Sequence, residues 1–129
     1  MVPGLTVTKL SLLAVDPDLQ SARALAEAFS RADFGFRAVP DLRRALAVLR
    51  STPVDVVLAV GNLDTPLVSQ LLGTLAHDAT LSRLPVVVLS TKGSAEDKRR
   101  AMEAGANAYL VKSSFDENEV LTTLRRLLE

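Results

Sequence analysis

The chain has 129 residues, which suits a single domain, and 48% of them are hydrophobic, as in ordinary globular proteins. Fifteen basic residues balance fifteen acidic ones, so the net charge gives no electrostatic basis for binding nucleic acid or an anionic membrane. Cysteine is absent, which excludes disulfides, thiolate nucleophiles and cysteine-bound metals.

We expect no signal peptide at the N-terminus. Residues 1–8 lack the basic start and apolar core of a signal peptide, and no apolar stretch of the chain is long enough to span a bilayer. We therefore expect residues 1–8 to form a short leader, residues 9–129 to form one domain, and the protein to be cytoplasmic.

The first half of the chain alternates short β-rich runs with helical patterns. Residues 10–15 predict a strand, and residues 19–32 predict a helix because their apolar side chains recur at helical spacing. Residues 35–39 predict a second, weaker strand. Asp41 is the expected N-cap of a helix that runs to about Arg50. Residues 54–60 then predict a third strand, which is almost wholly apolar.

The second half of the chain has three helix starts. Thr65-Pro66 places a hydroxyl at the cap and proline in the first turn of the third helix. Ser94 and Asp97 have the spacing of a capping box and start the fourth helix, which Gly105 ends. Asp116 caps the last helix. Two further strands are predicted between these helices, over residues 85–90 and 108–111.

Five strands thus alternate with five helices, and the strands are nearly continuous runs of valine, leucine and alanine. Such strands are typical of a parallel sheet that is covered on both faces. Right-handed crossovers then favour a doubly wound α/β sheet, with the flavodoxin-like strand order 2-1-3-4-5. Because the functional crevice of such a sheet lies at the carboxyl ends of its strands, we expect Asp16, Val60, Ser90 and Lys112 to lie near one another.

Nearly the whole chain, from Lys9 to about Leu128, resembles the CheY-like receiver domain of bacterial two-component response regulators. The resemblance rests on Val15-Asp16, on residues 54–60 with Asn62-Leu63 after them, on Leu89-Ser90, and on Tyr109-Leu110-Val111-Lys112. In that family the third strand ends in the aspartate that accepts a phosphoryl group. Val60 stands there in this chain and has no nucleophilic oxygen. The resemblance therefore implies a bacterial signalling module without enzymatic activity, a degenerate pseudo-receiver.

The resemblance also implies that the metal site is lost. Family members hold Mg²⁺ with an acidic pair after the first strand and with the acceptor aspartate. Asp16 matches the first acid of the pair, but Pro17 replaces the second. Asp18 follows one position later, where it could equally cap the first helix. We expect no metal, no cofactor and no catalytic residue.

Two further positions match the phosphate-binding part of the family, and a third departs from it. Ser90 matches the hydroxyl residue that contacts the phosphoryl group, and we expect it to serve the fold here. Lys112 matches the lysine that pairs with the phosphoryl group, and we expect its ammonium within about 4 Å of Asp16. Ser113 replaces a proline that usually follows a cis peptide bond, so a trans bond and a reshaped loop are expected.

The leading hypothesis for function is recognition of a protein partner without phosphorylation. In receivers the fourth helix, fifth strand and fifth helix carry partner binding or dimerisation. Lys98, Arg99, Met102 and Tyr109 are the predicted contact residues, and Tyr109 matches an aromatic residue whose rotamer reports the active or inactive state. A second copy of the chain, as a homodimer, is one possible partner.

Two alternatives remain open from the sequence. The first is a residual phosphotransfer activity that uses Asp16, Asp18 or Asp64. The second is sensing of a small molecule in the crevice, which Val60 and Pro17 make less polar than that of a working receiver.

Overall fold

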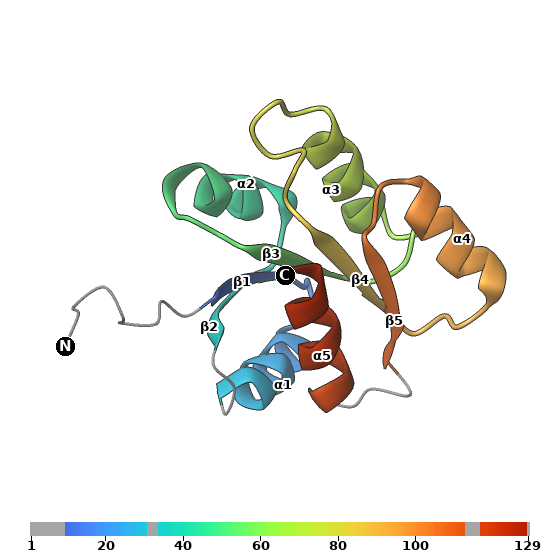
Figure 1. Cartoon of the computed structure of the whole chain (residues 1–129), viewed down its shortest axis with the longest axis horizontal. Coiled ribbons are helices and arrows are strands. Elements are labelled where there is room, and N and C mark those ends of the chain that lie inside the picture. The colour runs from blue at the N-terminus through green and yellow to red at the C-terminus, as the bar shows by residue number, and fades with distance from the viewer. Residues whose placement is uncertain (1–9, 31–33, 113–116, 129) are drawn as a thin grey trace.

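The computed structural model describes residues 10–30, 34–112 and 117–128. Five parallel strands form one sheet in the order β2-β1-β3-β4-β5 (Figure 1), which confirms the predicted flavodoxin-like α/β fold. In chain order the elements are β1 (Leu10–Val15), α1 (Leu19–Ser30), β2 (Phe34–Val39), α2 (Leu42–Ser51), β3 (Val56–Val60), α3 (Pro66–Ala76), β4 (Val86–Ser90), α4 (Ala95–Glu103), β5 (Ala108–Val111) and α5 (Glu117–Leu127).

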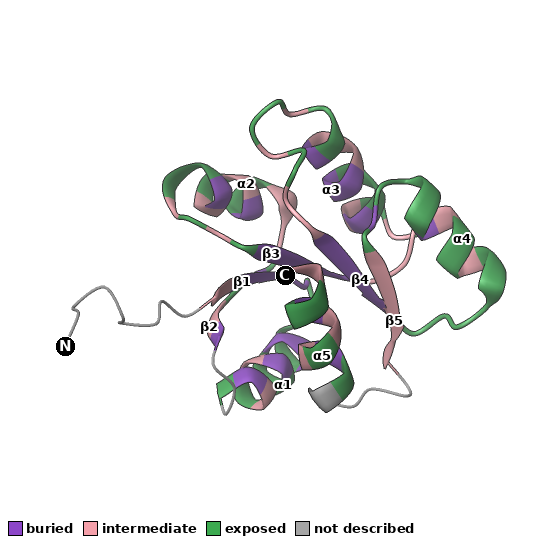
Figure 2. Ribbon diagram, viewed as in Figure 1, coloured by how far each residue is buried: buried purple, intermediate pink, exposed green. Residues whose placement is uncertain are grey.

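Helices cover both faces of the sheet. α1 and α5 lie together on one face, while α2, α3 and α4 cover the other (Figure 1). Every residue of β3 and β4 is buried, as the purple ribbon in Figure 2 shows, and β5 at the edge is half-buried. This explains why the central strands read as uninterrupted apolar runs.

Local capping chemistry sets most helix boundaries. Asp41 accepts a hydrogen bond from the Arg44 amide at 2.8 Å, and the Ser94 hydroxyl accepts one from the Asp97 amide at 3.1 Å, as predicted. α4 is followed by Gly105 at φ +116°, a left-handed conformation that favours glycine. Thr65 precedes Pro66 but makes no side-chain cap.

The predicted third strand is two residues too long at its start. β3 begins at Val56, because the Asp55 carboxylate accepts the Ser11 amide at 2.7 Å and so takes a donor that strand pairing would use. The predicted end of the first helix at Ala32 and the cap at Asp116 lie outside the described residues, as does the leader over residues 1–8. Among the helices that the structure describes, none is long and apolar enough to cross a membrane.

Candidate functional site

Four strands end at the same edge of the sheet. Their register pairs Val15 with Ala59, Val60 with Leu89, and Ser90 with Val111. The residues that end or follow these strands are Asp16, Val60, Ser90 and Lys112. The register therefore brings these four residues to one edge of the sheet, where the sequence predicts the crevice.

Val60 is a core residue at the end of β3. Its side chain is 7% exposed and belongs to the apolar cluster between the sheet and helices α1 and α5. Directly after it, Gly61 adopts φ +138°, and a Cβ there would lie 3.0 Å from Val68 Cγ2. The chain thus turns sharply after a buried isopropyl group, and this strand end presents no side-chain oxygen.

Asp16 is buried at the end of β1, with 3% of its surface exposed. Its Oδ1 accepts the Asp18 amide at 2.9 Å, whereas its buried Oδ2 has no hydrogen-bond partner among the residues that the structure describes. A carboxylate in this position is held by the turn that follows β1. Its second oxygen is left uncompensated, which is costly for a buried acceptor.

The predicted ion pair between Lys112 and Asp16 is wrong. The Lys112 ammonium donates to the Ser21 hydroxyl at 2.6 Å, and no ion pair within 4.0 Å joins it to a carboxylate in the described part of the chain. Ser21 is buried in the first turns of α1, so the lysine reaches across to that helix. Asp16 instead accepts the Asp18 amide, and this hydrogen bond holds its carboxylate in the turn between β1 and α1. The peptide bond of Ser113 lies outside the described residues.

Asp18 acts as the N-cap of α1. Its Oδ1 accepts the amides of Gln20 at 2.9 Å and Ser21 at 3.2 Å. Pro17 between the two aspartates offers no side-chain donor atom. Within the described ranges, no group of three or more histidine, cysteine, aspartate or glutamate residues is placed to hold a metal ion.

We expect Asp18→Ala to lower the free energy of unfolding by about 1 kcal/mol, because two amides of α1 lose their acceptor. Asp18→Asn, which keeps an acceptor oxygen, is expected to retain most of that stability. Urea denaturation of the two variants beside the wild type measures the difference. Equal losses for both would show that the charge of Asp18, and not its cap, matters.

Lys92, which no sequence pattern singled out, connects three parts of the site. Its amide donates to the buried Ser90 hydroxyl at 3.1 Å, its carbonyl accepts the Tyr109 hydroxyl, and its ammonium meets Asp64 Oδ2 at 2.9 Å. The loop between β4 and α4 is therefore fixed through both the backbone and the side chain of Lys92.

Asp64 joins that loop to the loop after β3. Its Oδ1 also accepts from Arg100 of α4 at 3.3 Å, so one carboxylate bridges two cations. The ammonium of Lys92 and then the guanidinium of Arg100 hold the pKa of Asp64 below its ordinary value of 3.8. We call Asp64, Lys92 and Arg100 the loop clasp.

The predicted contact residues on α4 differ in how free their charges are. Arg99 lies between Glu96 and Glu103, with 2.6 Å to Glu103, and these carboxylates raise its pKa. Lys98 is exposed, and Met102 is 40% exposed. Tyr109 on β5 is half-buried. This face thus combines the apolar side chain of Met102 with Arg99, whose charge is neutralised by its neighbours on the same helix.

Comparison with known proteins agrees with this architecture. The family model for the response regulator receiver domain matches residues 12–125. The chain is 42% identical over 53 residues to a gliding motility regulatory protein of Myxococcus xanthus, covering 41% of the chain and 7% of that protein. It is 28% identical over 119 residues to the probable transcriptional regulator ycf29 of Pyropia yezoensis, covering 91% and 52% respectively.

Solved structures show the same arrangement. The chemotaxis response regulator CheY4 of Vibrio cholerae superimposes with a TM-score of 0.81 and 26% identity, over 94% of this chain and all of that one. The chain spans about half or less of the length of the two curated relatives above.

Proposed function

The chain belongs to the response regulator receiver domain family, and we propose that it is a pseudo-receiver, which signals by protein contacts without accepting a phosphoryl group. The observation that carries this proposal is Val60, a buried core residue where the family has its acceptor aspartate. An alkyl side chain cannot form the acyl phosphate that switches a receiver.

The surroundings of Val60 support the same proposal. Asp18 is occupied as a helix cap, and Pro17 contributes no carboxylate, so Asp16 is the remaining acid of the pair. Mg²⁺ needs a near-octahedral shell of oxygen ligands, usually with one or two carboxylates and a phosphate. Lys112 bonds to Ser21, and no acid in the described part of the chain pairs with it. The residues that would take up and stabilise a phosphoryl group therefore serve the fold.

The loop clasp supplies a way to set the signalling face without phosphate. In the receiver family the hydroxyl residue that ends the fourth strand moves with its loop on activation. Here Ser90 and Tyr109 both bond to the backbone of Lys92, whose ammonium is held by Asp64. We infer that the clasp keeps this loop, and with it Tyr109, in one arrangement that a partner recognises.

Acid is expected to open the clasp. Because the pKa of Asp64 is lowered in the folded chain, the clasp stabilises the fold above the ordinary carboxyl pKa of 3.8, and this stabilisation is lost as the pH falls through the folded pKa. The pH dependence of the Asp64 carboxyl ¹³C shift measures that pKa. Lys92→Met is expected to raise it toward 3.8. Tyr109 is the single tyrosine and the chain has no tryptophan, so intrinsic fluorescence reports the loop directly.

Asp64→Asn is the control for this titration, since its fluorescence should not change over the pH range in which Asp64 titrates. If wild-type Tyr109 fluorescence were equally flat, the clasp would not hold the tyrosine. Unchanged Asp64 titration in Lys92→Met would contradict the ion pair itself.

Two measurements test the proposed function. After incubation with acetyl phosphate and Mg²⁺, mass spectrometry is expected to find no adduct of about 80 Da, the mass of one phosphoryl group. A stable adduct on Asp16, Asp18 or Asp64 would overturn the proposal in favour of residual phosphotransfer.

Partner binding tests the face of α4, β5 and α5. A pull-down from native cells is expected to lose its specific partner when Arg99→Glu and Tyr109→Ala are combined. Arg23→Glu, at an exposed position of α1, should keep the partner bound. Sedimentation of the same three proteins separates a homodimer from a complex with another protein. If only the α1 variant lost its partner, the interface would lie on that helix.

A small-molecule sensor is the second candidate, favoured by one cavity. A space of about 200 Å³ is lined by Ala24, Leu25, Leu89 and Lys112, so it is apolar with one cation at its wall. Among its described lining residues are neither Val60 nor Pro17, where the sequence predicts the sensing crevice. A thermal shift with a panel of metabolites, abolished by Ala24→Leu, would favour this function. The further predictions of a cytoplasmic and bacterial protein, of a leader over residues 1–8 and of no enzymatic activity remain predictions.

A further inference from the structure

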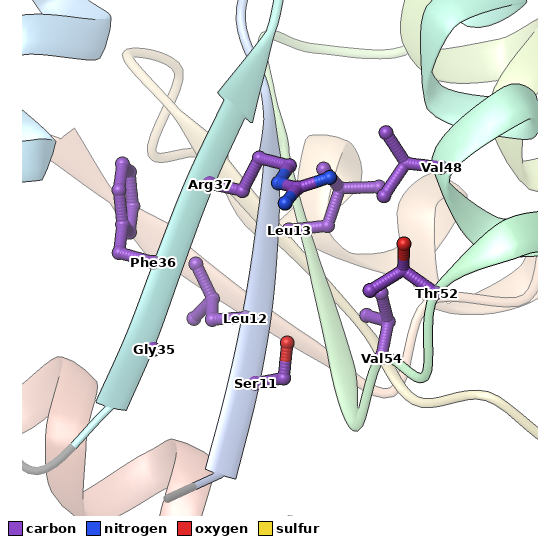
Figure 3. A pocket seen from close by; sticks show the side chains of 9 residues that line it. All are labelled: Ser11, Leu12, Leu13, Gly35, Phe36, Arg37, Val48, Thr52 and Val54. Carbon is purple, nitrogen blue, oxygen red and sulfur yellow. The ribbon is translucent and has the colours of Figure 1, made fainter.

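A second cavity lies at the opposite end of the sheet from the crevice. It has a volume of about 170 Å³ and lies between β1, β2, the end of α2 and the chain that follows α2. Figure 3 shows Ser11, Leu13 and Arg37 reaching from the two strands toward Val48, Thr52 and Val54. It shares no lining residue with the site described above.

The cavity exists because Gly35 leaves space beside Ser11. The two residues are register partners on β2 and β1, as are Arg37 and Leu13 one step further along the same face. A Cβ at Gly35 would meet only the Leu10 carbonyl, at 3.8 Å, and φ is not positive there, so the fold does not require glycine. α2 ends at Ser51 and therefore does not cover this part of the sheet.

Three donor side chains of this cavity, the first of them exposed and the other two half-buried, make no hydrogen bond or ion pair within the described ranges. They are the guanidinium of Arg37 and the hydroxyls of Ser11 and Thr52. Leu13, Val48 and Val54 supply an apolar wall beside them. A guanidinium with neighbouring hydroxyls matches a carboxylate, which accepts several hydrogen bonds at once.

We propose that this cavity binds a small monocarboxylate with an apolar body about the size of a benzene ring. A cavity of roughly 150 Å³ is known to accept benzene, so the volume here fits such a body. The carboxylate would meet Arg37 and the two hydroxyls, and the body would lie on Leu13, Val48 and Val54. Asp55 borders the site, because its Oδ2 accepts the Ser11 amide at 2.7 Å, and its charge opposes an anion.

An amide NMR titration with benzoate at constant ionic strength tests the proposal. The signals of Ser11, Gly35, Arg37 and Thr52 are expected to shift and to saturate, with a Kd on the order of 1 mM for so small a ligand. Benzamide, which has the same shape without the charge, should bind about tenfold more weakly. Phosphate, an anion without an apolar body, should give no saturating shift.

Variants separate the parts of the site. Arg37→Gln is expected to weaken benzoate binding about tenfold and to leave benzamide unaffected. Gly35→Val fills the space and should abolish binding of both, while Asp55→Asn, which keeps an acceptor for Ser11, should strengthen benzoate binding. Arg23→Gln, on the other face of the sheet, is the matched control and should bind as the wild type does.

Thermal melts establish that each variant folds, and Gly35→Ala, whose Cβ has room, replaces Gly35→Val if the larger side chain unfolds the chain. The proposal would be overturned if the wild type bound benzoate and benzamide equally well, or if it showed no saturating shifts. It would also be overturned if Arg37→Gln bound benzoate as tightly as the wild type does. None of these outcomes depends on whether the chain is phosphorylated.

Discussion

Val60→Asp is expected to lower the free energy of unfolding by about 3 kcal/mol and to leave the chain unlabelled by acetyl phosphate and Mg²⁺. The loss of stability follows from the position of Val60, which is 7% exposed and packed in the apolar cluster under α1 and α5. A carboxylate there gives up apolar contacts and loses its hydration.

Restoring one aspartate does not restore the chemistry around it. Asp16 directs one oxygen at the Asp18 amide, Pro17 brings no carboxylate, and the Lys112 ammonium is bonded to Ser21. A new carboxylate at position 60 would therefore lie beside buried Asp16 without a bound metal. Like charges so close destabilise one another, which adds to the cost of the substitution.

Two further variants make this result interpretable. Val60→Thr keeps the shape but replaces one methyl group with an uncharged hydroxyl, so it should lose less stability than Val60→Asp, which buries a charge. The double variant Val60→Asp with Pro17→Asp supplies both missing carboxylates and tests whether the metal site can be rebuilt. Denaturation and mass spectrometry are run on all of them. Efficient labelling of the single variant would show that the metal site is more intact than proposed.

The fold was predictable because its signals are local. The caps at Asp41 and Ser94 and the left-handed Gly105 act within one helical turn, so the chain near them determines the result. Uninterrupted apolar strands required cover on both faces, which restricted the sheet to one common order. The strand that began late, β3, did so because Asp55 bonds to Ser11, a residue 44 positions away.

The site was only partly predictable, because side-chain partners depend on distances across the fold. The strand ends brought Asp16, Val60, Ser90 and Lys112 to one edge, as expected. A lysine with a long, flexible stem can reach several acceptors, however, and the sequence does not reveal that Ser21 on α1 is within its reach. Lys92 was missed for the same reason, since its partner Asp64 is 28 residues away.

Leu124→Ala is expected to have the second large effect, a loss of about 2–5 kcal/mol in the free energy of unfolding. Leu124 is fully buried on α5, in the same apolar cluster as Val60 and Leu25 of α1. Its removal leaves a cavity beneath the helix, and the cost depends on how far the neighbours can close it. Leu121→Ala, at a half-buried position of the same helix, is the matched control and should lose less than half as much.

This pair of variants also distinguishes the packing of α5 on the sheet from direct contact between the proposed face and a partner. Leu124 is buried and cannot touch a partner, so any loss of partner binding in Leu124→Ala would come from the helix leaving the sheet. Amide hydrogen exchange should then be faster along α5 while β3 and β4 stay protected, because local opening exposes the least stable element first. Equal losses in the two variants would mean that the apolar stripe through Leu124 does not hold α5, and that the face depends on some other contact.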